Sequence, residues 1–315
     1  MLLLLTLAAV VAIPLGLDLY MPVPEENLLT VEKIELGRRL FNDRRLSRDG
    51  SIACASCHDP GRAFTDGRPV AVGVRGQTGE RSAPTLVNRG YGRSFFWDGR
   101  APTLEAQVLE PVANPKELDL SVGEAVGRLA HDESYRARFT EAFGAEVNAA
   151  NLARALASYV RTILSGDSPL DRYMNGEREA LSAQARQGLA LFRGKGNCTA
   201  CHVGPTLTDE QFHNTGVAWR DGRLTDNGRS AISGNERDRG AFKTPTLREV
   251  TRTAPYMHDG TIPTLEEVVD FYDTGGRLNL NLDPEIHPLH LTVEEKQALV
   301  AFLKSLSGSI REGQP

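Results

Sequence analysis

The chain contains two copies of one sequence pattern, and each copy is built around a Cys-x-x-Cys-His cluster. The first cluster spans Cys54–His58 and the second spans Cys198–His202. Matching segments flank both clusters in the same order: LGRRLF and QGLALF, FTDG and LTDE, SAPTLVN and KTPTLRE, WDGRAPTLEAQVLEP and HDGTIPTLEEVVDFY, ALASYVRTILSG and ALVAFLKSLSG. Repetition on this scale indicates two tandem copies of one domain.

The repeat sets the expected domain boundaries. The first domain is expected over residues 26–166, the second over 179–308, and a polar linker with Pro and Gly over 167–178. Thr292 and Glu295 form a capping-box pattern before an apolar stretch with helical spacing. Because alternating Val- and Ile-rich runs are scarce, the predicted class is all-α, with long loops around the clusters.

Each cluster has the spacing of a c-type haem attachment site. Two thiols three positions apart can each join a haem vinyl group, and the adjacent His can bind the iron. A zinc site of four thiols needs no His after each pair, and a redox dithiol normally lies in a βαβ unit. The interpretation is therefore two tandem cytochrome c-like domains with two covalently bound haems c, held by Cys54, Cys57 and His58 and by Cys198, Cys201 and His202.

Residues 1–25 are expected to be a signal peptide or an N-terminal membrane anchor, because Leu2–Leu17 carries no charge. No Lys or Arg precedes this stretch, and no clear cleavage site follows it. Export to the periplasm is the expected localisation. The net charge of −5 and the lack of a long basic run argue against a nucleic-acid partner.

The repeat also indicates what faces each iron. Aligned on the shared PTLE segment, Trp97 matches His258 and Pro111 matches Tyr272. Tyr can bind iron through its side chain and Pro cannot. This asymmetry predicts one haem closed by a sixth ligand and one haem that is open to a small oxidant.

The chain after residue 25 resembles the bacterial di-haem cytochrome c peroxidase and MauG family, through the motifs CASCH, APTLVN, FFWDGR, CTACH, TPTLR and APYMHDG. In that family the first haem reacts with peroxide, and the second relays or stores electrons. The resemblance assigns Gln107 and Glu117 to the peroxide pocket, Pro111 to its distal side and Trp97 to the space between the haems. Tyr272 occupies the sixth-ligand position of the second haem, which is Met in the peroxidases and Tyr in MauG-like members.

A second difference from the classical peroxidases also favours the MauG-like branch. Classical peroxidases carry a His in the loop before the APT motif, which blocks the first haem until activation. Val74 stands in that place, and no His occurs between His58 and His131. The first haem is therefore expected to be open in the resting protein.

Other candidate ligands remain as alternatives. Met257 is a second candidate for the second haem, and His258 is expected in a structural or propionate-contacting role. The remaining histidines match no ligand of the family: His131, His213, His287 and His290. The resemblance also makes one Ca²⁺ between the domains a candidate, at Ser82, Thr253 and Pro255, although Ser82 replaces the family's Asn.

The expected activity is oxidation of a protein partner with hydrogen peroxide. Glu117 would move a proton between the peroxide oxygens, Gln107 would orient peroxide and Trp97 would carry electrons. Each residue also has an alternative role without catalysis or iron binding: a surface carboxylate for Glu117, core packing for Trp97 and a haem-edge contact for Tyr272. The alternative functions are a cytochrome c peroxidase supplied by a small cytochrome c or cupredoxin, and a non-enzymatic di-haem electron carrier.

Overall fold

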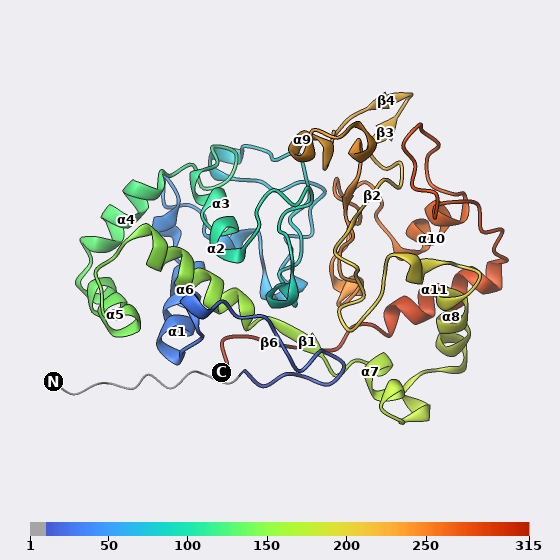
Figure 1. Ribbon diagram of the computed structural model, residues 1–315, viewed down its shortest axis with the longest axis horizontal. Helices are drawn as coiled ribbons and strands as arrows, with labels where there is room; N and C mark the ends of the chain where they lie inside the picture. Colours follow the sequence, from blue (N-terminus) through green and yellow to red (C-terminus); the bar gives the residue numbers. More distant parts are fainter. Residues whose placement is uncertain (1–10, 315) are drawn as a thin grey trace.

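The computed structural model describes residues 11–314 and places the two sequence repeats in two lobes that lie side by side (Figure 1). The first lobe contains α1 (Val31–Phe41), α2 (Leu104–Gln107), α3 (Glu110–Ala113), α4 (Val122–Ala130), α5 (Glu133–Phe143) and α6 (Ala149–Arg161). The second contains α8 (Ala183–Arg193), α9 (Ser230–Ser233), α10 (Leu265–Asp273) and α11 (Val293–Lys304). The expected helix-rich class with long loops is confirmed.

Each lobe is organised around one close helix crossing. A Cβ atom at Gly37 of α1 would lie 2.0 Å from the carbonyl oxygen of Ala155 in α6. The equivalent atom at Gly188 of α8 would lie 1.9 Å from the carbonyl oxygen of Ala298 in α11. Only glycine allows the two backbones to approach this closely. The same residue therefore produces the same helix pair in both repeats.

Three short antiparallel strand pairs accompany the helices, which the all-α expectation did not include. They are β1 (Leu164–Gly166) with β6 (Ser309–Arg311), β2 (Phe212–His213) with β5 (Phe242–Lys243), and β3 (Trp219–Arg220) with β4 (Arg223–Leu224). Strands of two or three residues are too short to show an alternating pattern in the sequence. The β1–β6 pair joins the end of the first repeat to the residues that follow the second.

The segment before the first repeat is packed against the rest of the chain. Leu17 and Met21 are buried in a small apolar cluster with Leu164. The backbone N–H of Leu15 donates to Asp167, and the carbonyl of Gly16 accepts from Arg248. The expected leader or anchor also includes residues 1–10, which lie outside the described residues. Within residues 11–314, no helix is long and apolar enough to cross a membrane.

The expected linker contains a short helix, α7 (Pro169–Met174). Its Leu170 is buried in the core of the second lobe, while the core of the first lobe is built from residues between Leu36 and Ile163. Asp171 of α7 forms a buried ion pair with Arg248 of the second lobe, at 2.5 Å. The linker is therefore part of the packed structure.

Candidate functional site

Both Cys-x-x-Cys-His clusters adopt the same tight turn. A 3₁₀ turn spans Cys54–Ser56 in the first lobe and Cys198–Ala200 in the second. In each cluster the backbone N–H of the His donates to the carbonyl of the first Cys, at 3.0 Å for His58 and 2.9 Å for His202. The turn holds two thiols and one imidazole within a single loop, as covalent haem attachment requires.

The imidazoles are oriented by backbone carbonyls. Nδ1 of His58 lies 2.9 Å from the carbonyl oxygen of Phe64, and Nδ1 of His202 lies 3.0 Å from that of Leu207. Because a carbonyl can only accept, each Nδ1 carries the proton and each Nε2 keeps its lone pair. Metal-binding histidines usually have this second hydrogen bond. The residues present therefore fit a haem iron bound by Nε2 in both lobes.

The PTL motifs hold the loops that provide these carbonyls. The Thr85 hydroxyl donates to the carbonyl of Ala63, and the Thr246 hydroxyl donates to that of Thr206, both at 2.6 Å. Ala63 and Thr206 each precede the residue whose carbonyl binds the imidazole. The PTL motif of each repeat thus supports the Cys-x-x-Cys-His cluster of the same repeat, which the sequence alone did not reveal.

A single zinc site made from all four thiols does not fit the structure. Cys54 packs against the core of the first lobe and Cys198 against the core of the second. The four thiols are therefore divided between two lobes instead of converging on one tetrahedral centre. The described cysteines form no disulfide.

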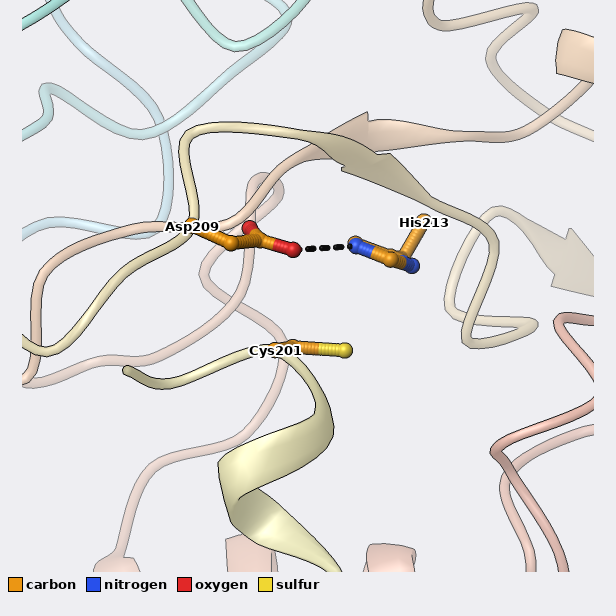
Figure 2. Close-up of side chains that lie close together, drawn as sticks. All are labelled: Cys201, Asp209 and His213. Carbon is orange, nitrogen blue, oxygen red and sulfur yellow. Dashed lines mark hydrogen bonds and ion pairs between the residues drawn. The ribbon is translucent and has the colours of Figure 1, made fainter. Parts of the chain in front are cut away.

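One other potential metal cluster occurs among the described residues, formed by Cys201, Asp209 and His213 (Figure 2). Nε2 of His213 lies 2.9 Å from Asp209, and its Nδ1 lies 2.6 Å from Asp283. The Cys201 sulfur and these two carboxylates raise the pKa of His213 to about 10. The imidazole of His213 therefore joins the carboxylates of Asp209 and Asp283, which belong to two different loops.

Glu117 lies beside the first cluster and is partly buried. Burial raises the pKa of its carboxyl group, and a 2.8 Å hydrogen bond from Asn114 partly opposes this effect. The charge of Glu117 also contributes, after burial and Asp66, to raising the pKa of the Cys57 thiol to about 11. The carboxyl group is therefore close to the expected haem and easily protonated, which argues against the surface alternative.

The other pocket residues lie on the two short helices before Glu117. Gln107 ends α2 and Pro111 lies in the first turn of α3, and both are partly buried. The backbone N–H of Leu118 donates to the carbonyl of Pro111 at 3.1 Å. This contact folds the chain back, so that Glu117 returns toward Pro111.

The loop that would carry a blocking His is held against Glu117. Val74 is 1% exposed, and its backbone N–H donates to the carbonyl of Glu117 at 2.9 Å. A Cβ at Gly73 would lie 2.2 Å from the carbonyl oxygen of Lys116, so the close approach requires glycine. The side chain at position 74 is therefore apolar and buried.

Tyr272 is near the end of α10, beside the second cluster. Burial and then the charges of Cys201 and Cys198 raise the pKa of its hydroxyl group. Its ring packs edge-on against Phe271, with the centroids 5.4 Å apart. Met257, the alternative ligand, is partly buried and has a left-handed backbone with a φ of 74°.

Trp97 lies where the two lobes meet. Its indole N–H donates to the carbonyl of Ser82 at 2.9 Å, and its own carbonyl accepts from the N–H of Lys243 at 2.8 Å. The N–H of Ser82 in turn donates to the carbonyl of His258 at 2.7 Å. Trp97 and its repeat counterpart His258 are therefore linked across the interface through one residue.

Comparison with known proteins identifies the family. Residues 31–179 match the family model described as di-haem cytochrome c peroxidase. The chain is 42% identical to the methylamine utilization protein MauG of Methylorubrum extorquens, over 90% of this chain and 81% of that protein. The chain belongs to the di-haem cytochrome c peroxidase family. It is also 38% identical to the cytochrome c551 peroxidase of Nitrosomonas europaea, over 87% of this chain and 79% of that protein.

Solved structures of this family have the same fold. A crystal structure of a MauG-like protein associated with microbial copper homeostasis matches with a TM-score of 0.87 at 36% identity, covering 93% of this chain and 95% of that one. The di-haem peroxidase BthA of Burkholderia thailandensis matches with a TM-score of 0.78 at 27% identity, covering 92% of this chain and 88% of that one. The recognised family and the peroxidase-type oxidoreductase class are confirmed, and the family implies two haems c.

The three residues expected to bind calcium, Ser82, Thr253 and Pro255, lie in loops outside the helices and strands. The carbonyl of Ser82 already accepts from Trp97, and the hydroxyl of Thr253 donates to the carbonyl of Val250 at 3.2 Å. Pro255 follows a cis peptide bond. Calcium binding at Ser82, Thr253 and Pro255 stays a prediction.

One interface cluster of this di-haem protein had no sequence signal. Glu210 of the second lobe accepts from Arg89 of the first at 2.6 Å, and Lys243 lies 3.6 Å from the same oxygen. The charges of Arg89 and Lys243 overcome burial and lower the pKa of Glu210 to about 2. Burial, followed by the charge of Arg89, lowers the pKa of Lys243 to about 7. These residues are far apart in the sequence, so only folding brings them together.

Proposed function

We propose that this protein is a MauG-like enzyme, which uses hydrogen peroxide to oxidise a protein partner by long-range electron transfer. The observation that carries the proposal is the asymmetry between the lobes. Tyr272 lies beside the second cluster, whereas its repeat counterpart Pro111 offers no side-chain ligand near the first. Tyr272 could therefore act as a second ligand to the haem held by His202, whereas a haem held by His58 would supply the iron that reacts with peroxide.

The first lobe provides the groups that peroxide chemistry needs. A haem bound through His58 would supply the iron that accepts peroxide. Glu117 takes the proton from the near oxygen and returns it to the leaving oxygen, a role that its burial and raised pKa favour. Gln107, at the end of α2, orients the peroxide.

Trp97 provides the route between the lobes. Its indole N–H donates to a carbonyl, which cannot accept a proton at neutral pH. Loss of an electron from Trp97 would therefore leave its proton in place and make the transfer readily reversible. The second lobe would hold oxidising equivalents at the His202 and Tyr272 haem until the partner supplies electrons.

We propose a protein as the partner, because electrons can reach a docked protein surface without a binding pocket. The leading class is a protein whose own residue is oxidised during maturation. We propose a periplasmic location, with residues 1–25 acting as a leader or an anchor.

A cytochrome c peroxidase supplied by a small cytochrome c or cupredoxin is the second candidate. The 38% identity to a cytochrome c551 peroxidase supports it. Tyr272 weighs against it, because an anionic oxygen ligand lowers the reduction potential of the second haem and weakens its ability to accept electrons from a high-potential donor. A di-haem electron carrier without enzymatic activity would require both haems to be six-coordinate.

Low-temperature electron paramagnetic resonance of the oxidised, untreated protein tests the proposal. One high-spin and one low-spin haem are expected, and peroxide should then give a persistent two-electron-oxidised protein without added reductant. Tyr272→Met should remove that persistence, whereas Tyr256→Phe, which alters another partly buried tyrosine of the same lobe, should retain it. Two low-spin haems in the resting protein would refute the proposal.

A further inference from the structure

A buried tyrosine of the first lobe is connected to the first cluster by aromatic packing. Tyr159 lies near the end of α6 and is 1% exposed. Its ring packs against that of Phe41 in α1, with the centroids 5.1 Å apart. The centroid of the Phe41 ring lies 6.4 Å from that of the His58 imidazole. Both distances are typical of packed aromatic pairs, so the three rings form a continuous row from the expected iron ligand to Tyr159.

The second lobe contains the same aromatic pair without the hydroxyl group. In the repeat, Phe192 corresponds to Phe41, and Phe302 corresponds to Tyr159. The rings of Phe192 and Phe302 lie 4.9 Å apart at an angle of 53°, close to the 5.1 Å and 56° of the pair in the first lobe. The helix crossing therefore needs an aromatic ring at this position, but it does not need a phenolic oxygen.

The hydroxyl group of Tyr159 donates a hydrogen bond to a carboxylate in the segment after β6. The acceptor is Glu312, which is partly buried. This segment is held on both sides, because β6 ends at Arg311 in its pairing with β1 and the N–H of Gly313 donates to Thr162 at 2.8 Å. Burial, followed by the hydrogen bond to Glu312, raises the pKa of Tyr159. Tyr159 is therefore a protonated phenol with a proton acceptor fixed beside it.

This arrangement favours loss of a proton together with an electron. A base that takes a proton must lie within hydrogen-bond reach of it, and Glu312 meets this condition. Trp97 has a different environment, because its indole N–H donates to a carbonyl, which does not take up a proton at neutral pH. Oxidation of Tyr159 can therefore be coupled to proton transfer, whereas oxidation of Trp97 would keep the proton in place.

We propose that Tyr159 is a redox-active residue, which gives one electron to the first haem after hydrogen peroxide has oxidised that haem, while its phenolic proton moves to Glu312. Hydrogen peroxide takes two electrons and two protons and becomes two molecules of water, and Tyr159 replaces one of these electrons. The O–H bond of Tyr159 breaks, an O–H bond forms on Glu312 and a neutral tyrosyl radical remains. The proposal rests on the proposed reaction of the first haem with peroxide.

The route would give the first lobe an electron source of its own. Figure 1 shows that the chain after β6 returns to α1 and α6 of the first lobe, which is where Tyr159 meets Glu312. The row of rings from His58 to Tyr159 includes neither Trp97 nor any residue of the second lobe. Tyr159 could therefore be oxidised when no protein partner is docked to supply electrons.

Electron paramagnetic resonance of the haem-loaded protein, frozen rapidly after addition of hydrogen peroxide without a reductant, tests the proposal. We expect an organic radical signal whose hyperfine pattern changes when the protein contains ring-deuterated tyrosine. Tyr159→Phe should abolish this signal, and Phe302 in the equivalent position of the second lobe indicates that the helix crossing accepts this change.

The matched control is Tyr135→Phe, which should keep the radical signal. Tyr135 is also fully buried in the first lobe, and its hydroxyl group also donates to a carboxylate, that of Asp43. A tyrosyl signal that persists in Tyr159→Phe, or that disappears in Tyr135→Phe, would overturn the assignment to Tyr159.

Variants of the acceptor test the coupled proton transfer. Glu312→Gln keeps an oxygen that can accept the hydrogen bond but cannot take the proton, so formation of the radical should slow by about 10²–10⁴-fold. Glu312→Asp retains a carboxylate and should recover part of the rate. The control is Glu146→Gln, an exposed residue of the first lobe, which should form the radical normally. An unchanged rate in Glu312→Gln would overturn the role of Glu312.

Optical spectra of the same samples separate this proposal from the proposed enzyme function. If peroxide changes the haem spectrum and no tyrosyl radical forms, the redox role of Tyr159 is wrong and the proposed function stands. If peroxide leaves the haem spectrum unchanged, the proposed function is wrong, and the role of Tyr159 fails with it.

Discussion

The two lobes share a framework and differ in the residues that face the expected irons. In both lobes a carbonyl orients the imidazole, a Thr hydroxyl holds the preceding residue and a Gly allows the main helices to cross. Pro111 and Trp97 of the first lobe correspond to Tyr272 and His258 of the second. The shared framework therefore fits the two haems that the family implies, and the differences support the proposed division of function between the lobes.

The backbone is repeated even where the side chains differ. Left-handed residues occur at equivalent positions in the two lobes: Phe64 and Leu207 with φ of 60° and 54°, Asn88 and Glu249 with 60° and 63°, Phe96 and Met257 with 65° and 74°. Such conformations cost free energy for residues other than glycine. Their repetition indicates that the loops around the two clusters keep the same backbone shape although their side chains differ.

The largest expected effect is on the rate of the peroxide reaction, which we assign to the first lobe alone. Glu117→Gln should slow the reaction with peroxide by about 10²–10⁴-fold, because an amide cannot take up and return the proton. Stopped-flow spectroscopy at the first haem measures the rate. Glu141→Gln, which alters an exposed residue of α5, is the control and should react normally. An unchanged rate for Glu117→Gln would remove this residue from the mechanism.

The contact between the lobes should be the next most sensitive feature. Glu210→Gln leaves Arg89 and Lys243 buried without their shared anion and should cost about 3 kcal/mol of stability. Thermal unfolding of the haem-loaded protein measures this loss. The control is Glu236→Gln, an exposed residue of the second lobe, which should have little effect. Equal unfolding temperatures for both variants would show that the lobes do not depend on this cluster.

The peroxide reaction should depend on pH through Glu117. Burial raises the pKa of this carboxyl group, so it stays protonated at pH values where an exposed Glu is charged. The rate should therefore fall as the pH is lowered through this raised pKa, by up to about tenfold per pH unit. The pH profile of Glu117→Gln should lack this acid limb. If the acid limb persists in the variant, it arises from the titration of another group.

The smallest expected effect tests the shared framework directly. Thr85→Val and Thr246→Val each remove one hydrogen bond to a carbonyl and should each cost about 1 kcal/mol. Since the two hydroxyls belong to different lobes, the double variant should show additive losses in chemical unfolding. Clearly unequal losses would mean that the lobes do not rely equally on this hydrogen bond.

Several features could be predicted because their signal is local or repeated. The haem clusters are contiguous, the capping box at Thr292 and Glu295 is present in the structure, and the repeat pairs Pro111 with Tyr272. The short strands could not be predicted, since two or three residues carry no period. The packing of residues 11–25 was also unexpected, because an apolar sequence does not specify what it packs against.

The sequence by itself determined the cofactor class, the two-fold repeat and the family, because these depend on the order and spacing of side chains along the chain. Only the tertiary structure decided how the lobes meet. The cluster of Arg89, Glu210 and Lys243 and the link from Trp97 through Ser82 to His258 join residues far apart in the sequence. Hydrogen bonds and ion pairs depend on distances of about 3 Å, which are set by the packing of the whole chain.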